Sequence, residues 1–99
     1  MASKQTETLT KLLSHSKSVV RQRAALGLQA CSAQAVAELS SVPLRNCLED
    51  ATERDFVRAA CGQTLSVIGD KDAVSGIIAA LDDARGDAWF RLVQALTAY

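Results

Sequence analysis

The chain has 99 residues, of which 48% are hydrophobic and 22% charged, and its formal net charge is zero. This composition is typical of a single globular domain and excludes a disordered chain. The sequence has neither an apolar run of the roughly 18 residues that a membrane span needs nor the apolar core of a signal peptide. We therefore expect a cytoplasmic protein without a membrane segment.

The pattern along the chain predicts an all-α fold. Apolar residues recur at spacings of three and four, and aromatic and β-branched residues are few. The spacing predicts helices at residues 4–15, 18–31, 34–49, 55–68, 72–82 and 87–98. Pro43 interrupts the third, which we expect either to kink or to divide into two short helices near Ser41. Residues suited to cap helix starts are Ser3, Ser18, Ser32 and Asp70 or Asp72, and Gly69 is suited to end a helix.

A phrase in the middle of the chain recurs 33 residues later. "LEDATERDFVR" at residues 48–58 returns as "LDDARGDAWFR" at residues 81–91. Upstream, "VVRQRAALGLQAC" at residues 19–31 matches "FVRAACGQTLSVI" at residues 56–68, with a spacing of 37. A period of this length is the signature of stacked helical hairpins. We expect one domain of three hairpins, at about residues 3–31, 33–68 and 71–99.

The stretch "VRAACGQTLSVIGDKDAVSGIIAAL", residues 57–81, resembles the HEAT-like repeat that also occurs in phycobilin lyases. The matching features are Val-Arg, a small residue, a leucine, a Gly-Asp turn, Ala-Val and a helix that ends in leucine. The resemblance implies a short α-solenoid of three hairpins. It also implies that the arginines opening the second helices pair with acids in the inter-helix turns, which map onto Asp50 or Asp55 and onto Asp83 or Asp87. A ligand-facing role for these guanidinium groups is the alternative.

The second helices of the hairpins should line a shallow concave face. In the helix at residues 55–68, the spacing predicts an apolar stripe of Val57, Ala60, Cys61, Thr64, Leu65 and Ile68. Arg58, Gly62, Gln63 and Ser66 are predicted on its other side. The residues expected near the concave face are Arg21, Gln22, Gln29, Arg58, Gln63, Ser66, Arg91 and Gln94.

Charge divides the chain into two halves. Residues 1–45 carry six basic and two acidic side chains, whereas residues 46–99 carry five and nine. This asymmetry permits head-to-tail stacking of copies. The acids in the turns either cap helices or form an edge that recruits a basic partner. Basic residues of the first half (Lys11, Lys17, Arg21 and Arg23) suit contact with phosphate, but the acidic second half disfavours nucleic-acid binding.

The sequence contains no recognisable catalytic or metal-binding motif. His15 is the only histidine and has no acid or nucleophile placed beside it by a motif. The three cysteines, Cys31, Cys47 and Cys61, lack metal-ligand spacing and are expected to be buried and reduced. We therefore expect a non-enzymatic protein without a cofactor or metal.

The last stretch, "DAWFRLVQALTAY" at residues 87–99, is apolar on nearly all sides of a helix. Repeat arrays normally end in a helix with a polar outer face, so this end does not look capped. Its large side chains either fold inward as a small core or form a contact surface. The candidate contact residues are Trp89, Phe90, Val93, Leu96 and Tyr99.

These features favour a protein-interaction scaffold that forms a homodimer about a two-fold axis through its C-terminal helix. The partner class is another protein. Two alternatives remain open. One is an accessory subunit that handles a small ligand or tetrapyrrole, in the manner of a lyase. The other is a weak nucleic-acid binder that uses the basic N-terminal half.

Overall fold

A computed structural model describes residues 4–99, and every regular element in this range is a helix. The all-α prediction is therefore confirmed. The α-helices are α1 (Lys4–Leu12), α2 (Ser18–Gly27), α3 (Ala33–Leu39), α4 (Ser41–Glu49), α5 (Asp55–Val67), α6 (Val74–Leu81) and α7 (Gly86–Thr97), and the short 3₁₀ turns are η1 (Leu28–Ala30) and η2 (Lys71–Ala73).

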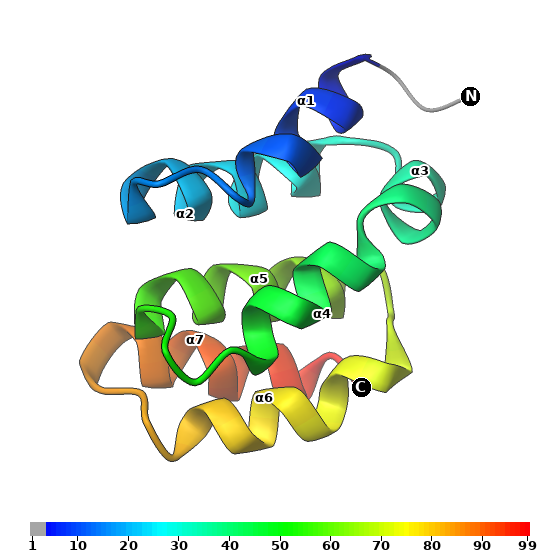
Figure 1. The fold of residues 1–99 in the computed structure, drawn as a ribbon. Coiled ribbons are helices and arrows are strands. Elements are labelled where there is room, and N and C mark those ends of the chain that lie inside the picture. The colour runs from blue at the N-terminus through cyan, green and yellow to red at the C-terminus, as the bar shows by residue number, and fades with distance from the viewer. Residues whose placement is uncertain (1–3) are drawn as a thin grey trace.

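The helices form two layers (Figure 1). One layer holds α2, α5 and α7 side by side, and the other holds α1, α3, α4 and α6. Within the layers, α5 packs between α2 and α7, and α4 packs on α6. Across them, α1 packs on α2, α4 on α5 and α6 on α7. The shortest extent of the molecule, 18 Å, agrees with two layers of helices, each about 10 Å in diameter.

The predicted break near Ser41 is confirmed, and it produces two helices rather than a kink. The chain turns at Ser40, which separates α3 from α4. Pro43 is the third residue of α4, where the missing N–H has no intrahelical partner to lose. The buried Ser40 hydroxyl lies 2.6 Å from the Thr10 hydroxyl, so α1 is fastened to the junction between α3 and α4.

The helix α5 occupies the centre of the core. Its predicted stripe is confirmed, since Val57, Cys61 and Leu65 are fully buried. The expectation that Arg58 and Gly62 lie on a polar side is wrong, because both are buried. The physical reason is that α2, α4 and α7 cover α5 on three sides, which leaves it little polar face.

Two of the expected helix caps are confirmed. The Ser32 hydroxyl accepts from the Ala35 N–H at the start of α3, and the Asp70 carboxylate accepts from the Asp72 N–H at η2. Ser18 is the first residue of α2 rather than its cap, so that assignment is wrong. Ser3 lies outside the described residues.

The expected glycine stop is also present, because Gly69 has a φ of 74° just after α5. None of the helices between residues 4 and 99 has the length and apolar character to cross a membrane.

Candidate functional site

The terminal helix α7 buries two alanines and one leucine and exposes its two aromatic side chains. Ala88, Leu92 and Ala95 are buried. Leu92 faces α5, since a Cβ placed on Gly62 would lie 3.1 Å from Leu92 Cδ2. Phe90 precedes Leu92 by two residues and so lies about 160° away around the helix axis. It therefore points away from α5.

The exposed apolar residues of α7 form a surface at the end of the helix row. Trp89 and Phe90 are 46% and 60% exposed, and their rings meet edge to face with centroids 6.5 Å apart. Val93 and Leu96 are half-buried, although Leu96 also packs against the core. We call Trp89, Phe90, Val93 and Leu96 the end face. The structure brings these four predicted contact residues together on one helix.

Tyr99, the fifth predicted contact residue, turns back toward the molecule. Its hydroxyl donates to the Asp70 carbonyl oxygen at 2.8 Å, although the side chain remains 42% exposed. Partial burial, and to a lesser extent the nearby Asp70, raises the pKa of the Tyr99 phenol. This hydrogen bond ties the chain end to the loop between α5 and α6, so we leave Tyr99 out of the end face.

Arg58 does not project onto a concave surface, which corrects its assignment to the concave face. It is only 3% exposed. Its Nε donates to the Leu48 carbonyl oxygen at 2.8 Å, and its Nη1 lies 3.1 Å from Asp83 Oδ2. The burial follows from the position of α5 between its neighbours. Arg58 therefore links the end of α4 to the turn between α6 and α7.

Arg21 forms a second link of this kind. Its Nε and Nη2 donate to the two carboxylate oxygens of Glu53 at 2.7 and 2.8 Å. Its Nη1 donates to the carbonyl oxygens of His15 and Ser16 at 2.6 and 3.0 Å. Burial disfavours ionisation of Glu53, but the hydrogen bonds from Arg21 and from the Arg54 N–H, together with the charge of Arg21, outweigh it and lower the pKa of the carboxyl group. Glu53 is not among the acids that the resemblance implies as partners of the arginines.

Arg91 differs from the other two arginines because it lies at the surface. It pairs within its own helix with Asp87, at 2.7 Å, and reaches the Gln63 side chain at 3.4 Å. Asp83 and Asp87 are both among the acids that the resemblance selects, whereas neither Asp50 nor Asp55 pairs with an arginine side chain in the described chain. The 33-residue spacing thus aligns Arg58 with Arg91 in sequence but not in burial.

The remaining residues of the expected concave face are polar and partly covered. Gln94 is exposed. Gln29, in η1, donates to the Thr64 hydroxyl at 3.2 Å, and this hydrogen bond joins η1 to α5. The half-buried members are Gln22, Gln29, Gln63 and Ser66.

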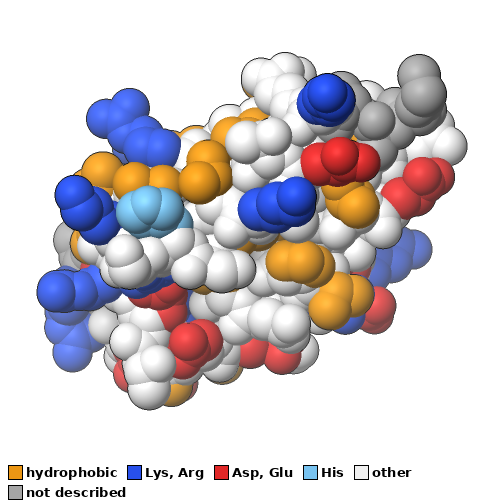
Figure 2. Space-filling view, turned by 45° about the horizontal axis from the view of Figure 1, so that its top comes forward, with side chains coloured by type: hydrophobic (Ala, Val, Ile, Leu, Met, Phe, Trp, Pro, Cys, Tyr) orange, Lys and Arg blue, Asp and Glu red, His pale blue; other side chains and the backbone are white. Residues whose placement is uncertain are grey.

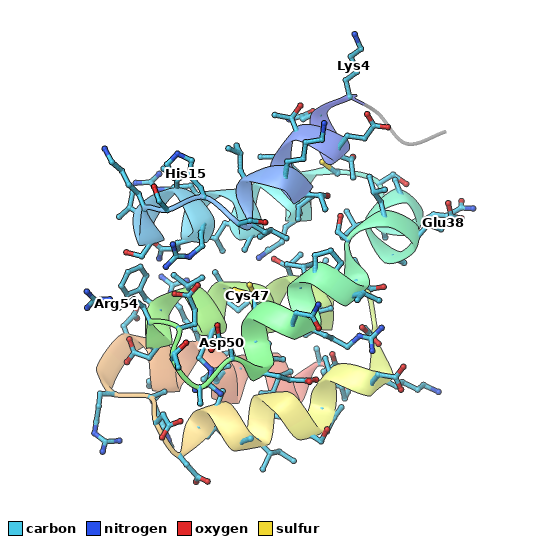
Figure 3. All side chains as sticks on the ribbon, viewed as in Figure 1. Lys4, His15, Glu38, Cys47, Asp50 and Arg54 are labelled. Carbon is cyan, nitrogen blue, oxygen red and sulfur yellow. The ribbon has the colours of Figure 1, made fainter. Side chains whose placement is uncertain are left out.

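A pocket that the sequence did not reveal lies between the turn after α1 and helix α4. Its volume is about 670 Å³. One wall is the turn after α1, and the other is formed by α4 and the turn after it. Figure 3 shows His15 on the first turn, Cys47 on α4 and Asp50 just after the end of α4. The lining residues are Leu13, Ser14, His15, Ser16, Arg21, Pro43, Asn46, Cys47, Asp50, Thr52 and Glu53. The lining residues Pro43, Asn46, Cys47 and Asp50 recur at spacings of three and four, which marks one side of a helix in the sequence. Only the fold shows that no helix within residues 4–99 covers this side.

His15 and the cysteines show no catalytic arrangement. His15 Nδ1 accepts from the Lys17 N–H at 3.0 Å, so the ring supports the start of α2. Cys61 is buried, Cys31 and Cys47 are half-buried, and all three are free thiols. A hydrogen bond with Cys47, together with burial, raises the pKa of the Cys61 thiol well above its usual range. Among residues 4–99, no group of three or more His, Cys, Asp or Glu side chains is arranged to hold a metal ion.

On the face drawn in Figure 2, the basic residues within 4–99 do not form a continuous track for phosphate. Figure 2 shows that Lys and Arg side chains gather near the histidine, while carboxylates and apolar side chains are interspersed over the same face. Arg21 is already occupied by Glu53.

No family model, curated protein or solved structure matches the chain. The resemblance to HEAT-like repeats therefore stays a prediction from the residues, and the function must be argued from the two surfaces described above.

Proposed function

We propose that this protein is a non-enzymatic interaction module, a short HEAT-like α-solenoid of three hairpins that forms a homodimer through α7. The packing of α2, α5 and α7 in one row supports the solenoid, as does the packing of α4 on α6. In this interpretation the hairpins are α1 with α2, α4 with α5, and α6 with α7, and α3 is an extra turn in the second.

The observation that carries the proposal is the end face. In a stacked array, each hairpin buries its apolar sides against two neighbours. The last helix of this row instead exposes Trp89 and Phe90 beside the half-buried Val93. Aromatic residues that are exposed together are enriched at protein interfaces and supply much of the binding energy there.

A second copy of the chain is the occupant that best fits this face. Asp87 and Arg91 lie on the same helix and are exposed, so the helix offers one charge of each sign. A two-fold axis brings identical surfaces together, and on such a surface Asp87 and Arg91 can exchange their pairing within α7 for pairing with the opposite charge on the partner. At the other end of the row, the exposed Lys17 and Arg23 make α2 a poorer apolar match.

Sedimentation equilibrium over a range of protein concentrations tests the proposal. We expect a dimer that persists at high salt, because the contact is mainly apolar. The double variant Trp89→Gln/Phe90→Gln should be a folded monomer by circular dichroism. The matched control is Val19→Gln/Val67→Gln, which removes two exposed apolar side chains from α2 and α5 and should remain dimeric.

A monomeric wild-type chain at every concentration would refute self-association, and so would a dimer that survives the double substitution in α7. Assembly that weakens as salt is added would instead favour head-to-tail stacking of the basic and acidic halves.

A further inference from the structure

The pocket between the turn after α1 and α4 owes its existence to the break at Ser40. The hydrogen bond between Thr10 and Ser40 holds α1 against the α3–α4 junction. Beyond that junction α4 packs on α5 and α6, whereas α1 packs on α2 and α3. The side of α4 that carries Pro43 and Cys47 therefore lines an open space, together with Asp50 just after the end of the helix.

The charges that line this pocket do not suit an anion. Arg21 is the one guanidinium in the lining, and its hydrogen bonds go to Glu53, His15 and Ser16. Two carboxylates, of Glu53 and Asp50, line the same space. An anion would meet these carboxylates without a free guanidinium to compensate for them.

Asp50 is held with one oxygen available. Its Oδ1 accepts from the Thr52 N–H at 2.9 Å and from the Thr52 hydroxyl at 2.6 Å. No residue between 4 and 99 forms a hydrogen bond or ion pair with Oδ2. The hydrogen bonds from Thr52 lower the pKa of Asp50, so the group stays ionised at neutral pH. A single free carboxylate oxygen suits one ammonium group better than a bidentate guanidinium.

The same pocket offers apolar surface for a short aliphatic chain. Leu13 lies on the turn side, and Pro43 and the Cys47 thiol lie on α4. Arg54 directly follows the lining residue Glu53 in the sequence, and its side chain points away from the pocket in Figure 3. We propose that the pocket binds an aliphatic ammonium group, with the stem against Leu13, Pro43 and Cys47 and the nitrogen at Asp50. This proposal is independent of dimer formation through α7.

An amide chemical-shift titration of the full chain tests the proposal. The probes are n-butylammonium chloride, Nα-acetyl-lysine N-methylamide and, as the uncharged isostere, n-butanol. We expect saturable shifts at residues 13–16, 47 and 50 with the cations, and binding of butanol weaker by roughly two- to fivefold, since an ion pair at an exposed carboxylate is lost. Tighter binding of the lysine derivative would identify a protein lysine as the source, and tighter binding of butylammonium a free amine.

The variant Asp50→Asn keeps the oxygen that Thr52 holds and removes the charge, so it should fold and bind the cations roughly two- to fivefold more weakly. Asp82→Asn, which neutralises an exposed carboxylate at the end of α6, should bind like the wild type. Unchanged binding in Asp50→Asn, equal binding of butanol, or the absence of saturable shifts with both cations would overturn the proposal.

Discussion

The three arginines at positions 21, 58 and 91 share a sequence context but experience three environments. Arg58 is enclosed, Arg21 is partly covered and tied to Glu53, and Arg91 lies at the surface. A resemblance can select acids for them, and it does select Asp83 and Asp87. It cannot predict which of the three arginines is buried, because burial depends on how many helices cover each position. For the same reason the resemblance did not select Glu53, which reaches Arg21 from the turn between α4 and α5.

Replacing Arg58 with methionine should destabilise the fold far more than the same change at Arg91. Arg58→Met leaves the buried Leu48 carbonyl without its donor, and we expect a loss of about 2–4 kcal/mol. Arg91→Met removes only an exposed pair within α7, which is typically worth about 0–1 kcal/mol. Urea unfolding followed by circular dichroism measures both. Equal losses in the two variants would mean that the burial of Arg58 contributes nothing to stability.

At the level of whole helices, local patterns predicted more than they did for single residues. The helical regions and the break near Ser41 follow from spacing and from proline, which act within a few residues. The side of α7 that faces the core cannot be predicted from such local patterns. Its apolar residues surround the axis, so the sequence gives no reason to bury Ala88, Leu92 and Ala95 rather than Trp89 and Phe90. Gly62 on α5 has no side chain, so α7 can approach α5 closely at this point. This close contact determines which side of α7 is buried.

A branched side chain at Gly62 should weaken the packing of α5 against α7 and so lower the free energy of unfolding. In Gly62→Val, the new atoms would enter the space of Leu92 and Ile77, and overpacking of this kind costs about 1–3 kcal/mol. Leu92→Ala alone should also destabilise, by about 2–5 kcal/mol, through the cavity it leaves. Denaturant unfolding of the double variant should give a loss smaller than the sum of the two. An additive double loss would show that the two residues do not share one space.

Over the whole molecule, the helices differ in how much core they share. The helix α5 packs against four other α-helices, α2, α4, α6 and α7, whereas Thr6 is the only buried residue of α1. The sequence predicted a stack of hairpins with equivalent members and could not foresee the pocket, since that requires knowing which side of α4 remains uncovered.

Native-state hydrogen exchange should reveal this inequality. Amides of α1 should open with a free energy well below that of global unfolding, while amides in the middle of α5 should exchange only when the whole chain unfolds. NMR-detected exchange at several low denaturant concentrations separates these cases. One common opening energy for α1 and α5 would instead indicate a fully cooperative unit and would contradict the expectation.

The place of Trp89 on the end face gives the molecule a built-in optical reporter. It is the chain's only tryptophan, and nearly half of its side chain is in contact with solvent. Covering the end face would move the indole from water to an apolar surface and shift its emission to shorter wavelength. Fraying of α1, at the far end of the layers, would leave that emission unchanged, so fluorescence can follow events at one end of the protein separately from events at the other.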